Sequence, residues 1–369
     1  MINPFYEKLA QLAVNYSLKV KKGDRVLIKG PSFAQELLQA LHTEVIKSGG
    51  NSLLYPSVEG EIELLFKYGT EEQLIYVDDV NLQIFKDFDG YIQIYADYNT
   101  RKLSLIDPVK MAKFQSAPKR KEIYRLITER YAKGEIHWVI LPFPCQSHAQ
   151  EANMDLFSFT NFIERALFLD KDDPAKEWSK LDIKQSKIVD FLNNVETIKV
   201  IGEDTNLEFS VKGRKWENCC GKVNLPDGEI FTGPVEDSVN GKIRFTYPGI
   251  YNGREIENIY LEFKKGKVIK AKAEKGEELL EEILKIENAD IIGEFAIGTN
   301  YGITKFIKYM LFDEKMGGTI HCALGLGLPE TGSKNVSAIH WDILKDMKHP
   351  GSQILADNKI IYEEGNWKI

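Results

Sequence analysis

The stretch Gly23-Asp24-Arg25-Val26-Leu27-Ile28-Lys29-Gly30 predicts a turn followed by a short buried strand. The residues that follow, 33–47, carry apolar side chains at helical spacing: Leu37, Leu38, Leu41 and Val45. Gly49-Gly50 then ends the helix, and residues 52–55 predict a second strand. A strand, a helix and a strand within ~30 residues form a parallel pair joined by a crossover helix. This stretch therefore predicts an α/β unit. No G-x-G-x-x-G motif follows its first strand, so no dinucleotide site is indicated.

The same α/β pattern extends to about residue 175. Residues 61–76 and 110–133 predict helices, and residues 90–95 and 136–142 predict two more strands. The break Asp172-Asp173-Pro174 marks the boundary between an N-terminal domain, 1–175, and a C-terminal domain, 176–369. Beyond it, several segments alternate apolar and polar residues between turns: 197–202, 207–214, 242–247 and 259–263. The sequence thus predicts the α/β class, with a parallel-sheet N-terminal domain and a strand-rich C-terminal domain.

Length, charge and cysteine content limit the class of protein. A chain of 369 residues exceeds the ~250–300 residues at which a single core stops growing, so two domains are expected. The formal net charge of -7 argues against nucleic acid as a partner, because nonspecific binding needs a basic surface. No apolar run approaches the ~20 residues that span a bilayer, and the polar first residues are unlike a secretory signal, so we expect no membrane partner. The four cysteines form no C-x-x-C pair, and the cytoplasm is the expected compartment.

The strongest functional signal lies between residues 293 and 342. This segment contains Glu294, the glycine-flanked His321, and the pair His340-x-Asp342. Imidazole and carboxylate together are the ligands that suit zinc, manganese, cobalt or iron. If the chain is extended at residues 340–342, the two side chains point to the same face of a strand and can reach one ion. Each pattern alone is common, so the metal hypothesis depends on their combination with the upstream segment 224–232.

Several motifs in this order and spacing carry a family resemblance. They are Asn224-Leu225-Pro226-Asp227-Gly228-Glu229, Gly293-Glu294, Gly298-Thr299-Asn300, Leu311-Phe312-Asp313-Glu314-Lys315, Gly318-Thr319-Ile320-His321, Pro329-Glu330-Thr331-Gly332 and His340-x-Asp342. With them the chain closely resembles the aminopeptidase T family of metallopeptidases, the group that includes AmpS and PepS. The resemblance runs along nearly the whole chain and is most specific from about Trp178 onward.

The resemblance implies a metal-dependent aminopeptidase that acts on short peptides with a free N-terminus. It also implies a Rossmann-like N-terminal domain, a C-terminal domain that carries the metals, and a homodimer. Five residues of this chain would then hold two divalent ions, which we expect to be Zn, Co or Mn: Glu229, Glu294, His321, His340 and Asp342. Three carboxylates and one bridging hydroxide would balance the charge of the two ions. Coordination lowers the pKa of water from 15.7 to about 7, so this hydroxide could exist at neutral pH.

One position departs from the family pattern. In the family a tyrosine lies seven residues after the histidine that matches His321, whereas this chain has Leu328 there. A phenol can donate a hydrogen bond to a developing oxyanion, and loss of one such donor can cost ~10²–10³ in turnover. Glu330 could serve as a general base, or it could be an ordinary turn residue.

Two other readings remain open at the level of sequence. His321, His340 and Asp342 match the two-histidine, one-carboxylate triad that holds a single Fe(II) in oxygenases, and some ring-cleaving dioxygenases are similar in fold to this family. Retention of Glu229 and Glu294 argues against that reading, because a mononuclear site does not need them. The third reading is a catalytically impaired relative that binds metal or peptide, for which the exchange at Leu328 is the only support.

Overall fold

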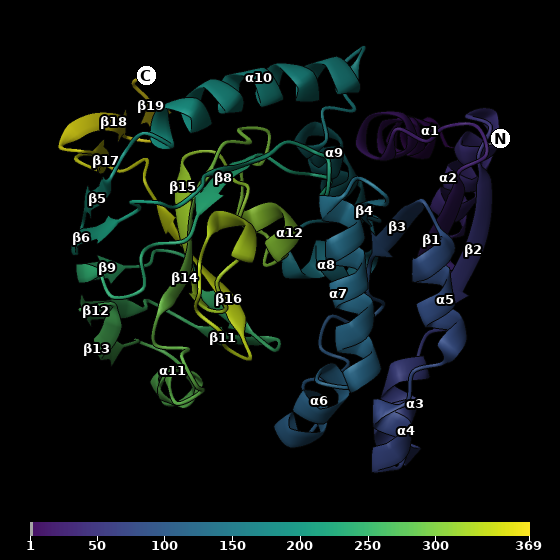
Figure 1. Cartoon of the computed structure of the whole chain (residues 1–369), viewed down its shortest axis with the longest axis horizontal. Coiled ribbons are helices and arrows are strands. Elements are labelled where there is room, and N and C mark those ends of the chain that lie inside the picture. Colours follow the sequence, from purple (N-terminus) through teal and green to yellow (C-terminus); the bar gives the residue numbers. More distant parts are fainter. Residues whose placement is uncertain (1–2) are drawn as a thin grey trace. The chain divides into compact units, whose positions relative to one another are not determined.

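The computed structural model describes residues 3–369, apart from the side chains at positions 108, 109 and 112. The chain forms two compact units (Figure 1). The first contains Met1–Ala175 and Gly221–Pro226, and the second contains Lys176–Cys220 and Asp227–Ile369. The short segment that returns to the first unit adds a bridge between Asn224 and Ile140.

The first unit is built on a parallel sheet with the strand order β2-β1-β3-β4. Its strands are β1 (Arg25–Pro31), β2 (Asn51–Ser57), β3 (Gly90–Tyr95) and β4 (His137–Pro142). Helix α2 (Gln35–Lys47) connects β1 to β2 and buries the four apolar residues that the sequence pattern assigned to one face. The predicted parallel α/β arrangement is therefore confirmed.

Two of the predicted helices are each divided in two. The segment 61–76 forms α3 (Glu61–Tyr68) and α4 (Glu71–Ile75). The first helix ends because the backbone of Gly69 is extended, and the second begins at Thr70, whose side chain takes part in a capping box. The segment 110–133 forms α6 (Pro108–Gln115) and α7 (Pro118–Ala132). Ala117, with φ -51° and ψ 129°, lies outside the helical region, which a residue that precedes proline avoids.

The first unit also contains further helices and helical turns. They are α1 (Pro4–Gln11), a π-helical turn at Leu12–Leu18, a 3-10 turn at Ser32–Ala34, α5 (Asp79–Asp87), α8 (Gln146–Glu151) and α9 (Leu156–Ala166).

The second unit contains two larger antiparallel sheets. The eight-stranded sheet has the order β13-β12-β9-β6-β5-β17-β18-β19. Its strands are β5 (Thr197–Gly202), β6 (Thr205–Ser210), β9 (Asn240–Arg244), β12 (Tyr260–Lys264), β13 (Lys267–Lys272), β17 (Gln353–Ala356), β18 (Lys359–Glu363) and β19 (Asn366–Trp367). The alternating segments predicted as strands supply β5, β6, β9 and β12, so the strand-rich prediction is also confirmed.

The five-stranded sheet has the order β16-β15-β14-β8-β7. Its strands are β7 (Glu217–Cys219), β8 (Glu229–Thr232), β14 (Ile292–Gly298), β15 (Thr319–Gly325) and β16 (His340–Asp346). The unit also contains the hairpin β10 (Gly249–Tyr251) and β11 (Arg254–Ile256), the helices α10 (Pro174–Leu192), α11 (Glu277–Leu284) and α12 (Met310–Asp313), and a 3-10 turn at Pro329–Thr331.

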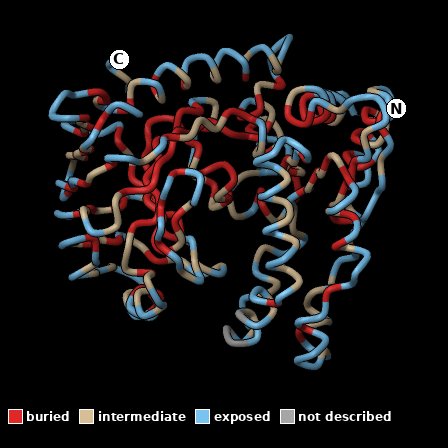
Figure 2. The backbone as a smooth tube through the Cα atoms, in the orientation of Figure 1, coloured by how far each residue is buried: buried red, intermediate tan, exposed pale blue. Residues whose placement is uncertain are grey.

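The core of the second unit lies between the two large sheets. Phe209 of β6 and Phe295 of β14 meet there with ring centroids 4.9 Å apart. Helices α10 and α11 close the core with Leu192 and Leu280, both fully buried. Figure 2 shows the buried residues concentrated along the central strands of this unit. The five-stranded sheet therefore has one face committed to the core, which leaves its other face for polar residues.

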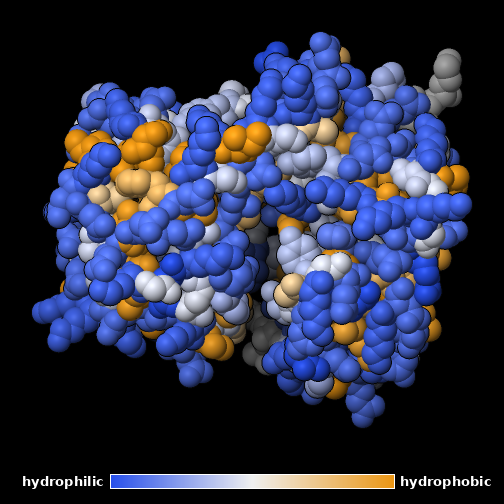
Figure 3. Space-filling model, turned by 45° about the horizontal axis from the view of Figure 1, so that its top comes forward, coloured by the Kyte–Doolittle hydropathy of each residue, from blue (hydrophilic) through white to orange (hydrophobic). Residues whose placement is uncertain are grey.

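Within residues 3–369, no helix combines the length and the apolar character that a membrane span requires. Figure 3 shows one face of the molecule, where hydrophilic side chains predominate and hydrophobic ones form separate patches.

Candidate metal centre

The register of the five-stranded sheet brings the candidate ligands onto one face. Glu294 of β14 pairs with Ala323 of β15, which pairs with Asp342 of β16. Residues directly opposite each other in a ladder share a face, so Glu294 and Asp342 flank Ala323 on the same side.

The other three candidate ligands lie on this face because strand side chains alternate with a period of two. His321 is two residues from Ala323 on β15, and His340 is two residues from Asp342 on β16. Glu229 of β8 pairs with Gly298, four residues after Glu294 on β14. The residues that directly follow Glu294, His321 and Asp342 point to the opposite face. They are Phe295, Cys322 and Ile343, which belong to the hydrophobic core.

Small residues separate the candidate ligands. Ala296 lies opposite His321, Ala323 lies between Glu294 and Asp342, and Gly298 lies opposite Glu229. A longer side chain in place of either alanine would fill the space among the imidazole and carboxylate groups, and a Cβ atom at Gly298 would clash with the backbone oxygen of Met316. The alternation of functional and small residues therefore keeps a polar space open over the sheet.

The side chains converge to distances that one or two ions could bridge. His321 Nε2 lies 3.2 Å from Glu294 Oε1, 3.6 Å from Glu229 Oε2 and 3.8 Å from Asp342 Oδ1. His340 Nε2 lies 3.3 Å from Glu294 Oε2 and 3.6 Å from Asp342 Oδ1. Glu294 thus presents one oxygen to each imidazole. Its two oxygens divide the five residues into two overlapping ligand groups, Glu229–Glu294–His321 and Glu294–His340–Asp342.

A hydrogen bond to the backbone orients the imidazole of His340. Its Nδ1 atom donates a hydrogen bond of 2.8 Å to the Leu326 carbonyl oxygen, which leaves Nε2 facing the carboxylates. A ligand histidine commonly bonds a carbonyl or carboxylate through its other nitrogen, because this fixes the tautomer and the ring orientation.

Buried carboxylate oxygens that lack a hydrogen-bond donor indicate whether metal ions fit these residues. Glu229 Oε2 and Asp342 Oδ1 are buried and have no hydrogen-bond donor among the residues that the structure describes. Buried oxygens without a donor are rare because they lose hydration without compensation. Divalent cations in the two ligand groups would satisfy both oxygens. The donor set, two imidazoles and three carboxylates, therefore fits divalent metal ions.

The pKa shifts within the cluster also indicate a site that needs positive charge. Burial would lower the pKa of His321, but the hydrogen bond to Glu294 and the charges of Glu229 and Asp342 raise it above its usual value. Burial opposes ionisation of Glu294, yet its contacts with His321 and His340 bring its pKa below the usual range. Burial raises the pKa of both Glu229 and Asp342. Without a metal ion, protons on the imidazoles therefore supply the positive charge that the carboxylates need.

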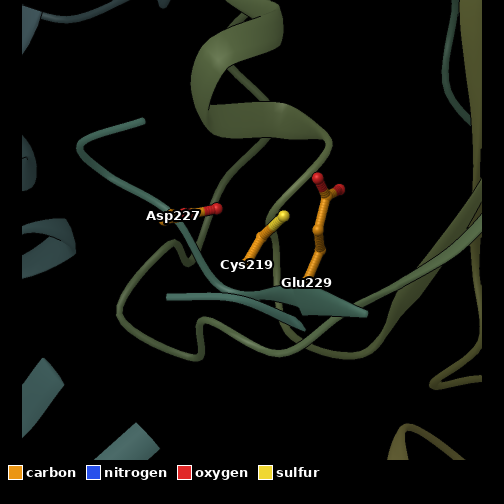
Figure 4. A group of neighbouring side chains, drawn as sticks. All are labelled: Cys219, Asp227 and Glu229. Carbon is orange, nitrogen blue, oxygen red and sulfur yellow. The ribbon is translucent and has the colours of Figure 1, made fainter. Parts of the chain in front are cut away.

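A second polar group adjoins the cluster at Glu229. Cys219 lies directly opposite Glu229 in the pairing of β7 with β8, and Asp227 precedes Glu229 by two residues. Ligand atoms of these three residues lie within 4.8 Å of one another. In Figure 4 the Cys219 sulfur lies between the side chains of Asp227 and Glu229. Gly228 permits this arrangement: its φ is +115°, and a Cβ atom there would lie 2.8 Å from Cβ of Asn300.

The structure also places Glu314 and Lys315 at the centre, although the sequence assigned no role to either residue. Glu314 offers an oxygen within 4.8 Å of ligand atoms of His321 and Asp342. The Lys315 ammonium contacts Glu229 Oε1 and lies 2.8 Å from Glu314 Oε1 and 4.0 Å from Asp227 Oδ1. The available signal was a run of charged residues, Asp313-Glu314-Lys315, close before the histidine strand.

Two residues singled out in the sequence lie in or beside the 3-10 turn Pro329–Thr331. Glu330 is exposed on the 3-10 turn Pro329–Thr331 and belongs to none of the groups of potential ligands found in the described part of the chain. Leu328, at the position of the family tyrosine, is half-buried and precedes the same turn.

The sequence as a whole is similar to known peptidases. The model of the family described as Thermophilic metalloprotease (M29) matches residues 3–367. Aminopeptidase 2 of Geobacillus stearothermophilus is 26% identical, and the alignment covers 98% of this chain and 97% of that relative. Aminopeptidase AmpS of Bacillus subtilis (strain 168) is 26% identical, with 99% of this chain and 100% of the relative covered.

A solved structure shares the fold over the whole length. Wild-type AmpT from Thermus thermophilus superimposes with a TM-score of 0.85 and 21% sequence identity, and the match covers 99% of both chains. At this level of identity the structural match shows a common architecture of both units.

Proposed function

This chain belongs to the thermophilic metalloprotease (M29) family, and we propose that it is a metal-dependent aminopeptidase with a two-metal centre on the five-stranded sheet. The family match spans residues 3–367, and the relatives that cover nearly the whole chain are named aminopeptidases. The resemblance inferred from the sequence motifs is thereby confirmed, and the chain is a peptide-bond hydrolase. The observation that carries the two-metal proposal is the position of Glu294, whose two oxygens each face a different histidine.

The proposed ligands are the five residues on the polar face. Glu229, Glu294 and His321 would hold one ion, and Glu294, His340 and Asp342 would hold the other. Imidazole with carboxylate suits Zn, Co or Mn, and two ions per chain are proposed. When bound, such a pair supplies a hydroxide nucleophile at neutral pH and polarises the scissile carbonyl group.

Two carboxylates are proposed as alternative general bases. Glu330 was suggested by the sequence, but it is exposed and lies outside the ligand groups. Glu314 approaches His321 and Asp342, and it is held by the Lys315 ammonium. A general base must lie within hydrogen-bond reach of the proton that it removes, directly or through one water. The geometry therefore favours Glu314 over Glu330.

The proposed substrates are short peptides with a free N-terminus, as the names of the relatives suggest. A cytoplasmic homodimer is proposed from the family resemblance and from the absence of any disulfide pattern in the sequence. No nucleic acid or membrane is proposed as a partner of this acidic chain.

The Fe(II) alternative is less favoured. A mononuclear site would use His321, His340 and Asp342, yet a further carboxylate oxygen of Glu229 lies 3.6 Å from His321 Nε2 and has no donor among the described residues. A second ion gives that oxygen a partner, whereas a single Fe(II) at the triad does not require it.

The deciding experiment measures peptidase activity and metal content together. Chelated protein is reconstituted with Zn, Co, Mn or Fe(II) and assayed on unblocked dipeptides and aminoacyl arylamides, with Nα-acetylated versions as matched controls. We expect release of the N-terminal residue from unblocked substrates only, at two ions per chain. Equal hydrolysis of acetylated substrates would argue against an aminopeptidase, and one bound iron with oxygen uptake would favour the dioxygenase. Two bound ions without turnover would indicate an impaired relative.

A further inference from the structure

We propose that the Lys315 ammonium is a built-in positive charge of the metal centre. It holds one oxygen of Glu229, and it occupies the position that a further metal ion would take among Cys219, Asp227 and Glu229. This inference deepens the proposed function, since it rests on Glu229 being a metal ligand. Lys315 is a positioning residue in this account, because it acts through Glu229.

The first support is the burial and contacts of Lys315. Its side chain is only 2% exposed, and its ammonium contacts Glu229 Oε1 with Glu314 Oε1 at 2.8 Å and Asp227 Oδ1 at 4.0 Å. A buried ammonium is costly unless it is paired and hydrogen-bonded. Three carboxylates around one nitrogen provide that pairing, so the position of the charge is determined by the fold.

The second support is that the two oxygens of Glu229 have different surroundings. Oε1 is bound by Lys315, whereas Oε2 points to His321 at 3.6 Å and has no donor in the described part of the chain. The lysine therefore leaves Glu229 a single free oxygen on the side of the histidines. If Lys315 were neutral, both oxygens could bind metal, and the carboxylate could rotate.

The third support is the composition of the group on the other side of Glu229. Cys219, Asp227 and Glu229 bring a sulfur and two carboxylates within 4.8 Å of one another, from elements that converge in Figure 4. Thiolate and carboxylate are ligands of Zn and Co. Lys315 already contacts Glu229 and lies near Asp227, so its positive charge disfavours a divalent ion at this place.

Titration of the metal-free protein with Co(II) tests the proposal. A cobalt ion bound by a thiolate absorbs in the near ultraviolet, so Cys219 reports directly on whether the group holds metal. We expect two cobalt ions per chain and no thiolate absorption for the unaltered protein. Lys315→Met should bind a third ion and gain the absorption band, and Lys315→Met combined with Cys219→Ser should lose that band. Lys315→Arg, which keeps the positive charge, should behave as the unaltered protein.

Two results would overturn the proposal. One is a Lys315→Met protein that binds no additional cobalt and shows no thiolate band. The other is a Cys219-dependent band in the unaltered protein, because the group would then hold metal beside the lysine. If Lys315→Met does not fold without metal, refolding with cobalt becomes the readout. Recovery with the thiolate band supports the proposal, whereas failure to recover while Lys315→Arg folds indicates that Lys315 is only structural.

The test separates this inference from the proposed function. The two-metal centre is judged by the cobalt stoichiometry of the unaltered protein and by its loss in His321→Ala. The role of Lys315 is judged by the difference between Lys315→Met and the unaltered protein and by the dependence of that difference on Cys219.

Discussion

Glu294 Oε1 lies 3.2 Å from His321 Nε2, although the two residues are not directly opposite each other in the ladder between β14 and β15. Glu294 pairs with Ala323, and His321 pairs with Ala296. The contact is diagonal, and it is possible because alanine fills the facing position on each strand. Diagonal neighbours in a sheet are within reach of long side chains, and here the small residues leave the space in which they meet.

Replacement of Glu294 should affect both proposed ions. Glu294→Gln removes the charge that faces His321 and His340, so we expect metal affinity to fall by more than the ~10–100-fold that loss of a partner of a ligand histidine costs, because Glu294 is itself a proposed ligand of both ions. Peptidase activity should fall with it. Metal per chain after dialysis and turnover on an unblocked dipeptide measure the two effects. Glu281→Gln, at an exposed position of α11, is the matched control. Unchanged metal content in Glu294→Gln would refute the proposed ligand set.

Leu328 provides a test for gain of activity. Leu328→Tyr restores the phenol that the family carries at this position, and one oxyanion donor is worth ~10²–10³ in turnover. We expect kcat to rise with no change in metal per chain. Leu328→Phe adds the ring without the hydroxyl group and should give no comparable increase. If the two variants have equal turnover, the hydroxyl group does not act as a donor here.

The general base can be identified by comparing two carboxylates. Glu314→Gln should lower kcat by ~10²–10⁴, the range for loss of a general acid or base. Glu330→Gln should leave kcat nearly unchanged, because the side chain is exposed on a turn and belongs to none of the ligand groups in the described residues. Steady-state kinetics of both variants at equal metal loading check this order. The reverse order would restore Glu330 as the base.

Metal binding should release protons. The pKa of His321 is raised to about 9 and that of His340 to about 10, whereas an ordinary histidine titrates near about 6.5. Both imidazoles are therefore protonated at pH 7 in the metal-free chain, and each must lose a proton to bind metal. Apparent affinity should rise as the pH increases from 7 toward these values.

Calorimetry in two buffers of different ionisation enthalpy measures the protons released. His340→Ala should release one proton fewer than the unaltered protein at pH 7. His349→Ala removes an exposed histidine and should release the same number as the unaltered protein. Binding without proton release would show that the imidazoles are already neutral.

Side chains on the core face of the five-stranded sheet should contribute strongly to the free energy of unfolding. Phe295 is fully buried next to Glu294 and meets the rings of Phe209 and Trp216 at 4.9 and 6.3 Å. Phe295→Ala should lower the free energy of unfolding by ~3–5 kcal/mol, because it leaves a cavity between the sheets. Denaturant unfolding of the metal-free chain gives the value. Ile269→Ala, 59% exposed in the same unit, should stay within about 0.5 kcal/mol.

The sequence by itself determined the class of each unit, and its family resemblance suggested the five candidate ligands. Local spacing was enough for β1, α2 and β2, because periodic apolar residues report which face is buried. It was also enough to suggest that His340 and Asp342 share a face, since this needs only an extended chain. The sequence did not divide the helices at Gly69 and Pro118, where a local backbone preference outweighed the apolar pattern.

Only the tertiary structure decided how the candidate ligands meet. Glu229, Glu294 and His321 come from β8, β14 and β15, and their approach depends on strand register and on the alanines and glycine that face them. Likewise, Lys315 and Cys219 are ordinary residues in the sequence, because nothing local shows that an ammonium and a thiol converge on Glu229. Charge pairing between distant segments depends on burial, and burial is a property of the folded chain.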